Sequence, residues 1–90
     1  MNDELLYIGI RVAGPKYVVY PTTEKAYLHS LEKNESDVWY FTSTKSINDF
    51  AQAGVFGAYD SYESAENAIL SVDSSAKVVY KPGTTPPPTD

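Results

Sequence analysis

The sequence contains no cysteine and only one histidine, His29, among its 90 residues. Without cysteine, the chain can form neither a disulfide framework nor a thiolate metal site. The residues around His29 show no HExxH-type spacing, and no G-x-S-x-G motif is present on which a nucleophilic serine could sit. These absences predict a non-enzymatic protein that uses no metal or cofactor, with His29 at the surface or at the rim of a site.

Positive charge is also scarce. Seven Lys and Arg against twelve Asp and Glu give a net charge of -5, and the basic residues never form a run. Such a chain repels phosphate backbones, so direct nucleic-acid binding is not expected. The early apolar run from Leu5 to Ile10 is far shorter than the ~20 residues of a membrane span, and Asp3 and Glu4 stand where a signal peptide has basic residues. We therefore expect a cytoplasmic protein without a membrane role.

Aromatic side chains, by contrast, are abundant. The chain has eight tyrosines, three phenylalanines and one tryptophan. Tyr and Trp offer large rigid surfaces with a hydrogen-bonding tip, and they dominate the energetics of protein interfaces. The composition therefore predicts that the protein works by contact with a protein partner or with further copies of itself.

The length of the chain predicts a single domain over residues 1–81. Residues 6–12 alternate between apolar and other side chains, which is the pattern of a half-buried strand. Residues 16–20 are rich in β-branched and aromatic residues, and Pro21 ends this second strand. The two segments are separated by Ala-Gly-Pro, so a β-hairpin is predicted.

Residues 22–33 fit two structures. Thr23 could cap a helix with Tyr27 and Leu31 on one face, whereas Tyr27 and His29 could also alternate along a strand. Turn-forming residues on both sides of the segment favour the strand. The strand is the prediction, and the helix is the alternative.

Residues 38–43 form the densest aromatic segment of the chain, with Trp39, Tyr40 and Phe41 in succession. Aromatic and β-branched residues are enriched in strands. This segment is therefore predicted to be the central strand of a sheet.

Two helices are predicted from their caps. Ser46 begins a short helix over residues 46–53, which Gly54 ends. Asp60 is the predicted N-cap of the main helix, over residues 61–72, because apolar residues follow it at helical spacing.

The last predicted strand covers residues 76–81, with Val78 and Tyr80 on one side and Val79 on the other. The predicted fold class is therefore α+β. Four or five mostly antiparallel strands pack one face against the main helix, and the short helix covers an end.

Residues 82–90 differ in composition from the rest, being rich in proline and threonine. Such a segment cannot form a helix and has little apolar surface to fold onto a core. An extended C-terminal tail is predicted.

The predicted partner-binding residues lie on an aromatic sheet face and in this tail. They are Trp39, Tyr40, Phe41, Tyr20, Tyr80, Pro86, Pro87 and Pro88. An aromatic sheet face could instead stack nucleic-acid bases, but the cations that bind phosphate are missing. The function predicted from these residues is that of a small structural or accessory subunit of a larger assembly.

Acidic residues suggest an alternative, in which the protein imitates nucleic acid and inhibits a DNA-handling enzyme. The residues concerned are Glu32, Glu35, Asp37, Asp60, Glu63 and Glu66. In its compact, cysteine-free and tyrosine-rich character, the chain also resembles small proteins encoded by bacteriophages. That resemblance implies either a minor virion component or an inhibitor of a host enzyme, located in the virion or in the host cytoplasm.

Overall fold

The structure is a computed structural model that describes residues 5–82. It contains five strands and three helices in the order β1 (Leu6–Ala13), β2 (Lys16–Thr22), α1 (Glu24–Lys33), β3 (Val38–Ser43), α2 (Ile47–Gln52), β4 (Gly57–Tyr59), α3 (Tyr62–Val72) and β5 (Lys77–Tyr80). The predicted α+β class, with one main helix and a shorter α2, is confirmed.

The five strands form one sheet in the order β4-β2-β1-β3-β5, and every neighbouring pair is antiparallel. The central strand is therefore β1, and the prediction that residues 38–43 occupy the centre is wrong. The predicted hairpin places β2 along one edge of β1, and β3 pairs with its other edge, so that Ile10 lies opposite both Val19 and Trp39.

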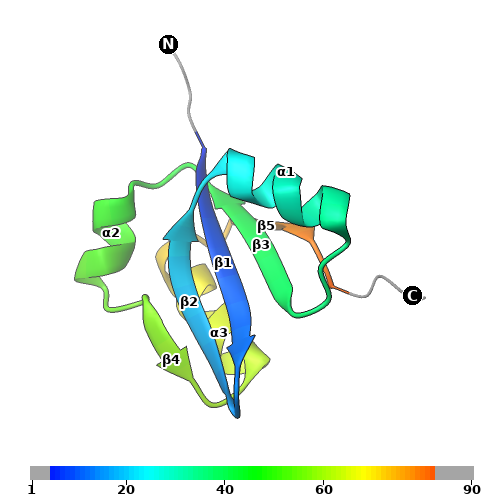
Figure 1. Ribbon diagram of the computed structural model, residues 1–90. Helices are drawn as coiled ribbons and strands as arrows, with labels where there is room; N and C mark the ends of the chain where they lie inside the picture. Colours follow the sequence, from blue (N-terminus) through cyan, green and yellow to red (C-terminus); the bar gives the residue numbers. More distant parts are fainter. Residues whose placement is uncertain (1–4, 83–90) are drawn as a thin grey trace.

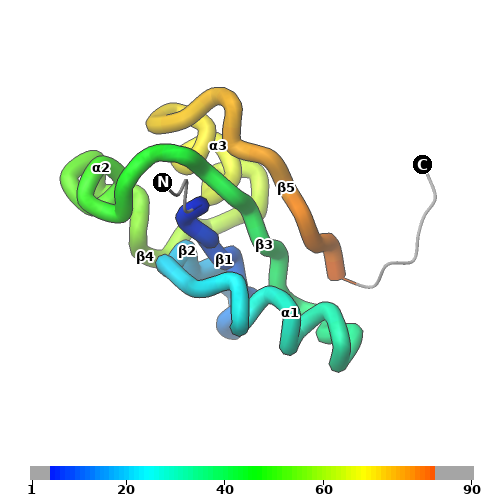
Figure 2. The backbone as a smooth tube through the Cα atoms, turned by 90° about the horizontal axis from the view of Figure 1, so that it is seen from above, coloured from blue at the N-terminus to red at the C-terminus, as the bar shows by residue number. Residues whose placement is uncertain are grey.

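Helices cover both faces of this sheet, as the two views in Figure 1 and Figure 2 show. α3 lies on one face and α1 on the other, with the strands between them. We call these the α3 face and the α1 face. Because side chains alternate along a strand, neighbouring residues of β1 contribute to different layers.

Residues 24–33 form a helix, so the predicted strand is wrong and the alternative holds. The Thr23 side chain accepts a hydrogen bond from the backbone N–H of Ala26 at 3.1 Å, which caps the N-terminus of α1. Asn34 ends the helix with a left-handed φ of 55°. The helix turns Tyr27 and Ser30 toward the sheet and leaves His29 exposed.

β4, for which the sequence predicts no strand, replaces residues 22–33 as the fifth strand. It has only three residues and pairs with β2, with Ala58 opposite Val18. Its formation depends on a partner that is distant in sequence, so no local pattern predicts it.

Both predicted helices begin at a serine N-cap. Ser46 and Asp49 form a reciprocal capping box at the start of α2. The N-cap of α3 is Ser61, which accepts a hydrogen bond from the N–H of Ser64 at 3.1 Å. The predicted cap, Asp60, instead forms an ion pair with Lys16.

A β-bulge separates Val78 from Tyr80. In the register of β3 with β5, Tyr80 lies opposite Tyr40 while Val78 lies opposite Phe41, which leaves Val79 as an extra residue. The prediction that Val78 and Tyr80 share a face is therefore wrong. Val78 packs on the α3 face, and Tyr80 is buried on the α1 face.

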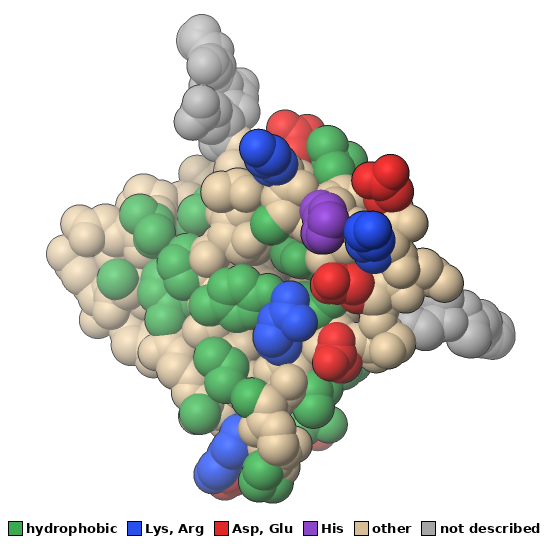
Figure 3. All heavy atoms as spheres, viewed as in Figure 1, with side chains coloured by type: hydrophobic (Ala, Val, Ile, Leu, Met, Phe, Trp, Pro, Cys, Tyr) green, Lys and Arg blue, Asp and Glu red, His purple; other side chains and the backbone are tan. Residues whose placement is uncertain are grey.

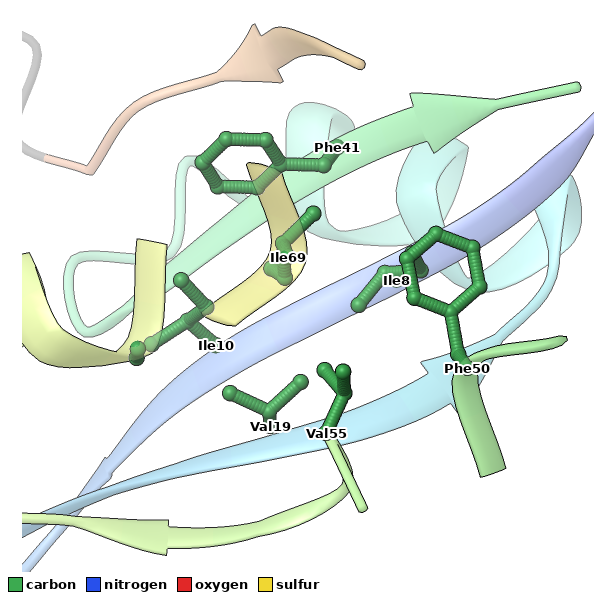
Figure 4. Packing of buried hydrophobic residues seen from close by; sticks show 8 residues of the cluster. Ile8, Ile10, Val19, Phe41, Phe50, Val55 and Ile69 are labelled. Atoms are coloured by element: carbon green, nitrogen blue, oxygen red, sulfur yellow. The ribbon is translucent and has the colours of Figure 1, made fainter. Parts of the chain in front are cut away.

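The main core lies on the α3 face, where side chains from strands and helices converge (Figure 4). Its buried members are Ile8, Ile10, Val19, Phe41, Phe50, Val55, Ala65 and Ile69. A second, smaller cluster lies on the α1 face and consists of Val38, Tyr40 and Tyr80, with Tyr27 of α1 packed against them. The two clusters differ in chemistry, because the second is built mainly from tyrosines.

Candidate functional site

The predicted partner-binding aromatics do not share one surface. Phe41 is 2% exposed within the main core, and Tyr40 and Tyr80 are 2% and 7% exposed beneath α1. These three rings stabilise the chain itself and are not accessible on its surface. Trp39 and Tyr20 are half-buried and keep some accessible area. Pro86, Pro87 and Pro88 lie outside the described residues.

Part of the α1 face has no helix over it in the described structure. In Figure 1, α1 crosses the sheet near the start of β1 and leaves the other end of β1, together with β2 and β4, uncovered on that side. The register places Ala58, Val18 and Arg11 side by side there, with Tyr20 next to them on β2. We refer to these four residues as the open half-face. Figure 3 shows hydrophobic side chains spreading across this side of the molecule from a central basic residue.

Tyr20 is held in place by a glycine. Gly9 lies opposite Tyr20 in the β1–β2 register, and a Cβ atom on Gly9 would lie only 2.5 Å from Cζ of the tyrosine. The ring therefore lies directly across the β1 backbone, a position that no larger residue than glycine permits. Burial raises the pKa of the Tyr20 hydroxyl, while a hydrogen bond with Arg11 and the charge of Arg11 act in the opposite direction.

Arg11 links the open half-face to the loop that follows α1. Its guanidinium lies 3.7 Å from a carboxylate oxygen of Glu35 and 3.9 Å from one of Asp37. Both distances are long for an ion pair, and the guanidinium has five N–H donors. Arg11 can therefore donate to a further carboxylate or carbonyl group of a partner without losing its position.

A pocket of about 380 Å³ lies between Arg11 and α1. It is lined by Arg11, Thr23, Lys25, Ala26, His29, Ser30, Glu35 and Tyr40. The prediction that His29 lies at a surface or rim is confirmed, since it is exposed and borders this pocket.

The hydroxyl groups of the pocket are engaged with one another. Tyr40 and Ser30 share a hydrogen bond of 2.6 Å, and Ser30 donates to a carboxylate oxygen of Glu35 at 2.8 Å. Because the Ser30 proton goes to Glu35, the Tyr40 hydroxyl is the donor to Ser30. This relay connects α1, through Ser30, to β3 and to the loop that follows the helix. Among residues 5–82, no three His, Asp or Glu side chains are grouped so as to hold a metal ion.

Trp39 belongs to a separate aromatic group at one end of the α3 face. Its ring lies 4.5 Å from that of Tyr62, the first residue of α3, and 6.0 Å from that of Tyr17 on β2. Burial raises the pKa of the Tyr62 hydroxyl, and the nearby Glu66 carboxylate raises it further. These contacts pack Trp39 against the main core and leave it half-buried.

A second pocket, of about 250 Å³, surrounds a buried carboxylate. Asp73 accepts hydrogen bonds from the Ser43 hydroxyl at 2.6 Å and from the backbone N–H of Ser75 at 2.9 Å. The Ser43 hydrogen bond, followed by that of Ser75, lowers the pKa of the Asp73 carboxyl. The carboxylate joins the end of α3 to β3, which is a structural role.

The acidic residues of the nucleic-acid-mimic alternative lie in two layers. Glu32, Glu35 and Asp37 belong to α1 and its following loop, whereas Glu63 and Glu66 belong to α3 on the opposite face (Figure 2). The ion pairs of Glu35 and Asp37 with Arg11 also neutralise part of the first group. The two groups do not combine into one acidic row.

The chain has no significant match among protein-family models, curated proteins or solved structures. None of the helices described between residues 5 and 82 is long and apolar enough to cross a membrane. Inferences about function therefore depend on the residues and contacts given above.

Proposed function

We propose that this protein is a non-enzymatic protein–protein interaction module that acts as a small structural or accessory subunit of a larger assembly. The open half-face is its main partner surface in this proposal. The observation that carries the proposal is the stretch of sheet formed by Val18, Tyr20 and Ala58 around Arg11, which no described helix covers.

The composition of this surface supports binding to a protein. Tyrosine and arginine are the residue types most often responsible for interface affinity, and both occur here at fixed positions. Tyr20 is immobilised over Gly9, so its ordering costs little further entropy on binding. A partner with an apolar side chain for Val18 and Ala58 and a hydrogen-bond acceptor for Arg11 would complement it.

The remaining parts of the proposal concern place and partner. The negative net charge favours a partner with a basic or neutral surface over nucleic acid. The proposed setting is the cytoplasm, or the virion and host cytoplasm for a phage-encoded protein. An inhibitor of a host enzyme that used the open half-face would satisfy the same geometry, and it differs from a structural subunit in having a single catalytic partner.

The open half-face is tested by placing a charge on it. Ala58 is exposed and lies at its edge, so Ala58→Lys should fold normally while adding a charge that a partner must desolvate. Ala51→Lys is the matched control, because Ala51 is also exposed but lies on α2. We expect a partner captured from the native cells to lose at least about tenfold in affinity for Ala58→Lys only. Equal binding by both variants would contradict the proposal.

The non-enzymatic part of the proposal is tested at His29. His29→Ala removes the only imidazole from the pocket, and its side chain is exposed, so the fold should be kept. Partner binding and biological activity are expected to stay unchanged. Loss of activity in a folded His29→Ala protein that still binds its partner would instead indicate catalysis at this pocket.

The C-terminal residues 82–90 remain a predicted second contact. A chain ending at Lys81 should bind its partner less tightly while its melting temperature stays nearly constant. An equal loss of thermal stability would show that Pro86, Pro87 and Pro88 belong to the fold.

A further inference from the structure

α1 presents an outward stripe made of Lys25, Leu28 and Glu32. The spacings of three and four residues place these side chains on one side of the helix. Tyr27 and Ser30, which pack against the sheet, mark the opposite side. Figure 2 shows α1 as the outermost layer on its face of the molecule. All three residues of the stripe are exposed, and Lys25 also borders the pocket between α1 and Arg11.

The stripe lacks partners within the part of the chain that the structure describes. Leu28 is 49% exposed, and the neighbouring Leu31 is equally exposed. Across residues 5–82, ion pairs are formed by Arg11 and Lys16 with Glu35, Asp37 and Asp60, and none involves Lys25 or Glu32. Lys25 and Glu32 are two helical turns apart, about 10 Å along the axis, so they do not neutralise each other directly.

The order of these residues makes the stripe complementary in charge to a second copy of itself that runs antiparallel. Read from the N-terminus of α1, it runs from a positive charge through an apolar side chain to a negative charge. A second stripe running in the opposite direction offers a negative charge to Lys25 and a positive charge to Glu32. Leu28 lies close to the midpoint of the two charged positions, where the two leucines would meet.

We propose that α1 is the self-association surface of this protein, on which α1 of a second copy packs antiparallel about a two-fold axis. The interface is isologous, so each Lys25–Glu32 ion pair is formed twice and Leu28 of each copy fills the centre. Leu31 lies beside the stripe and adds apolar area at the border of the contact.

The contact is expected to be weak. A helix of ten residues is about 15 Å long, which gives an interface well below the size of a stable permanent dimer. Two copies with a net charge of -5 each also repel one another at long range. We therefore expect association that is measurable only at high protein concentration. Such a weak contact becomes effective where many copies are held together in an assembly.

This surface adjoins the open half-face at one place, because Lys25 and Arg11 line the same pocket. Otherwise, self-association uses the outer stripe of α1, whereas the proposed partner surface lies on β1, β2 and β4. Neither Leu28 nor Ala58 lines that pocket, so Leu28→Gln tests one proposal, Ala58→Lys tests the other, and either can fail alone.

The test is a charge exchange between Lys25→Glu and Glu32→Lys. Each variant places like charges against each other in its own dimer, while an equimolar mixture of the two restores opposite charges at both contacts. Both changes suit the helix dipole, since an acidic residue is added near the N-terminus and a basic residue near the C-terminus. The helix should therefore persist, as circular dichroism will verify.

Sedimentation velocity up to about 1 mM protein measures the association. We expect the native chain to self-associate, each single variant to associate at least about tenfold more weakly, and the mixture to regain most of the native affinity. A native chain that stays monomeric at this concentration overturns the proposal. So does a mixture that associates no better than the separate variants.

A matched pair of apolar positions provides the second measurement. Leu28 on α1 and Ile47 on α2 are both 49% exposed, so replacing either by Gln should change stability to a similar small extent. Leu28→Gln is expected to weaken self-association at least about fivefold, while Ile47→Gln leaves it unchanged. Equal effects of the two substitutions, or none from Leu28→Gln, would overturn the proposed interface.

Discussion

The two faces of the sheet are covered by different chemistry. On the α3 face, apolar side chains such as Ile8, Phe50 and Ile69 are buried completely. On the α1 face, Tyr27 and Tyr40 join α1 to the sheet through ring contacts and hydroxyl groups. The first layer excludes water along the strands, whereas the second covers only one end of its face.

This difference indicates how stability and accessibility are divided. Burial of apolar area provides most of the free energy of folding, so the α3 face should determine the stability of the domain. Hydrogen bonds between tyrosine, serine and glutamate contribute less on balance, because the same groups bond to water when unfolded. They do fix the position of α1, which leaves Arg11 and Tyr20 accessible beside it.

The largest expected effect is on the α3 face, from Phe50→Ala. Phe50 is fully buried between α2 and the core, and loss of a buried phenyl ring costs about 3 to 5 kcal/mol. A domain of this size has only about 5 to 10 kcal/mol in total, so the variant should be close to unfolding at room temperature. Urea titration followed by tryptophan fluorescence measures the change. A loss below 1 kcal/mol, a threshold about one third of the smallest expected value, would show that the α3 face is not the dominant core.

Sequence signals predicted the α3 side of the molecule better than the α1 side. The capping box of Ser46 and Asp49 and the apolar spacing in residues 61–72 are local, and the structure contains both helices. The hairpin of β1 and β2 also follows from neighbouring residues. Local patterns were sufficient in these places because residues close in sequence make the backbone hydrogen bonds of the caps and of the hairpin.

Residues 24–33 carried local signals for both structures. The alternation of Tyr27 and His29 is compatible with a strand, whereas Thr23 caps the helix that the structure contains. The contacts of Tyr27 with Tyr7 and Tyr40, which are distant in sequence, could not be predicted from the local pattern. That single error extends to the predicted site. Without α1 over the sheet, Tyr40 and Tyr80 would lie on an open face, as predicted, whereas beneath α1 they are buried.

Tyr20 was predicted to bind a partner, but the position of its ring could not be predicted. The ring occupies the space above Gly9, and only the β1–β2 register brings these two residues together. Arg11 was not predicted at all. An arginine within an otherwise apolar alternating strand was the available signal, since such a residue must face a carboxylate or solvent.

The next largest effect is expected at Gly9, where Gly9→Ala would force the Tyr20 ring out of its place. The added Cβ would lie 2.5 Å from the ring, and the repacking should cost about 1 to 3 kcal/mol. A double-mutant cycle with Tyr20→Ala separates this clash from other causes, since the cost should largely vanish once the ring is absent. Purely additive changes in the free energy of unfolding would show that the two residues do not interact.

Asp73→Asn should have a smaller effect, which depends on pH. The hydrogen bond from Ser43 lowers the pKa of Asp73 in the folded state below 3.8, so the ionised carboxyl stabilises the fold above that pH. Near neutral pH the substitution should cost about 1 to 2 kcal/mol, because an ionised hydrogen-bond acceptor is lost.

The difference between native and Asp73→Asn proteins should shrink as pH falls through 3.8 toward the lowered pKa of the folded state. Urea titrations at several pH values measure it. Ser43→Ala is the matched control, because it removes the main cause of the shift while keeping the carboxyl. A difference that is constant with pH would contradict this account.

The smallest effect concerns the α1 face and is expected from Tyr40→Phe. The substitution keeps the buried ring but removes the hydroxyl that donates to Ser30, and it should cost about 1 kcal/mol. The loss should be local, since the relay to Ser30 and Glu35 fixes α1 to the sheet. Amide hydrogen exchange should therefore accelerate in α1 more than in α3. Tyr62→Phe is a suitable control, because the Tyr62 hydroxyl makes only a 3.5 Å contact with Glu66 and belongs to α3, on the opposite face of the sheet from α1. If Tyr40→Phe accelerated exchange equally in both helices, the α1 face would share the cooperative core of the α3 face, and the division between them would have to be abandoned.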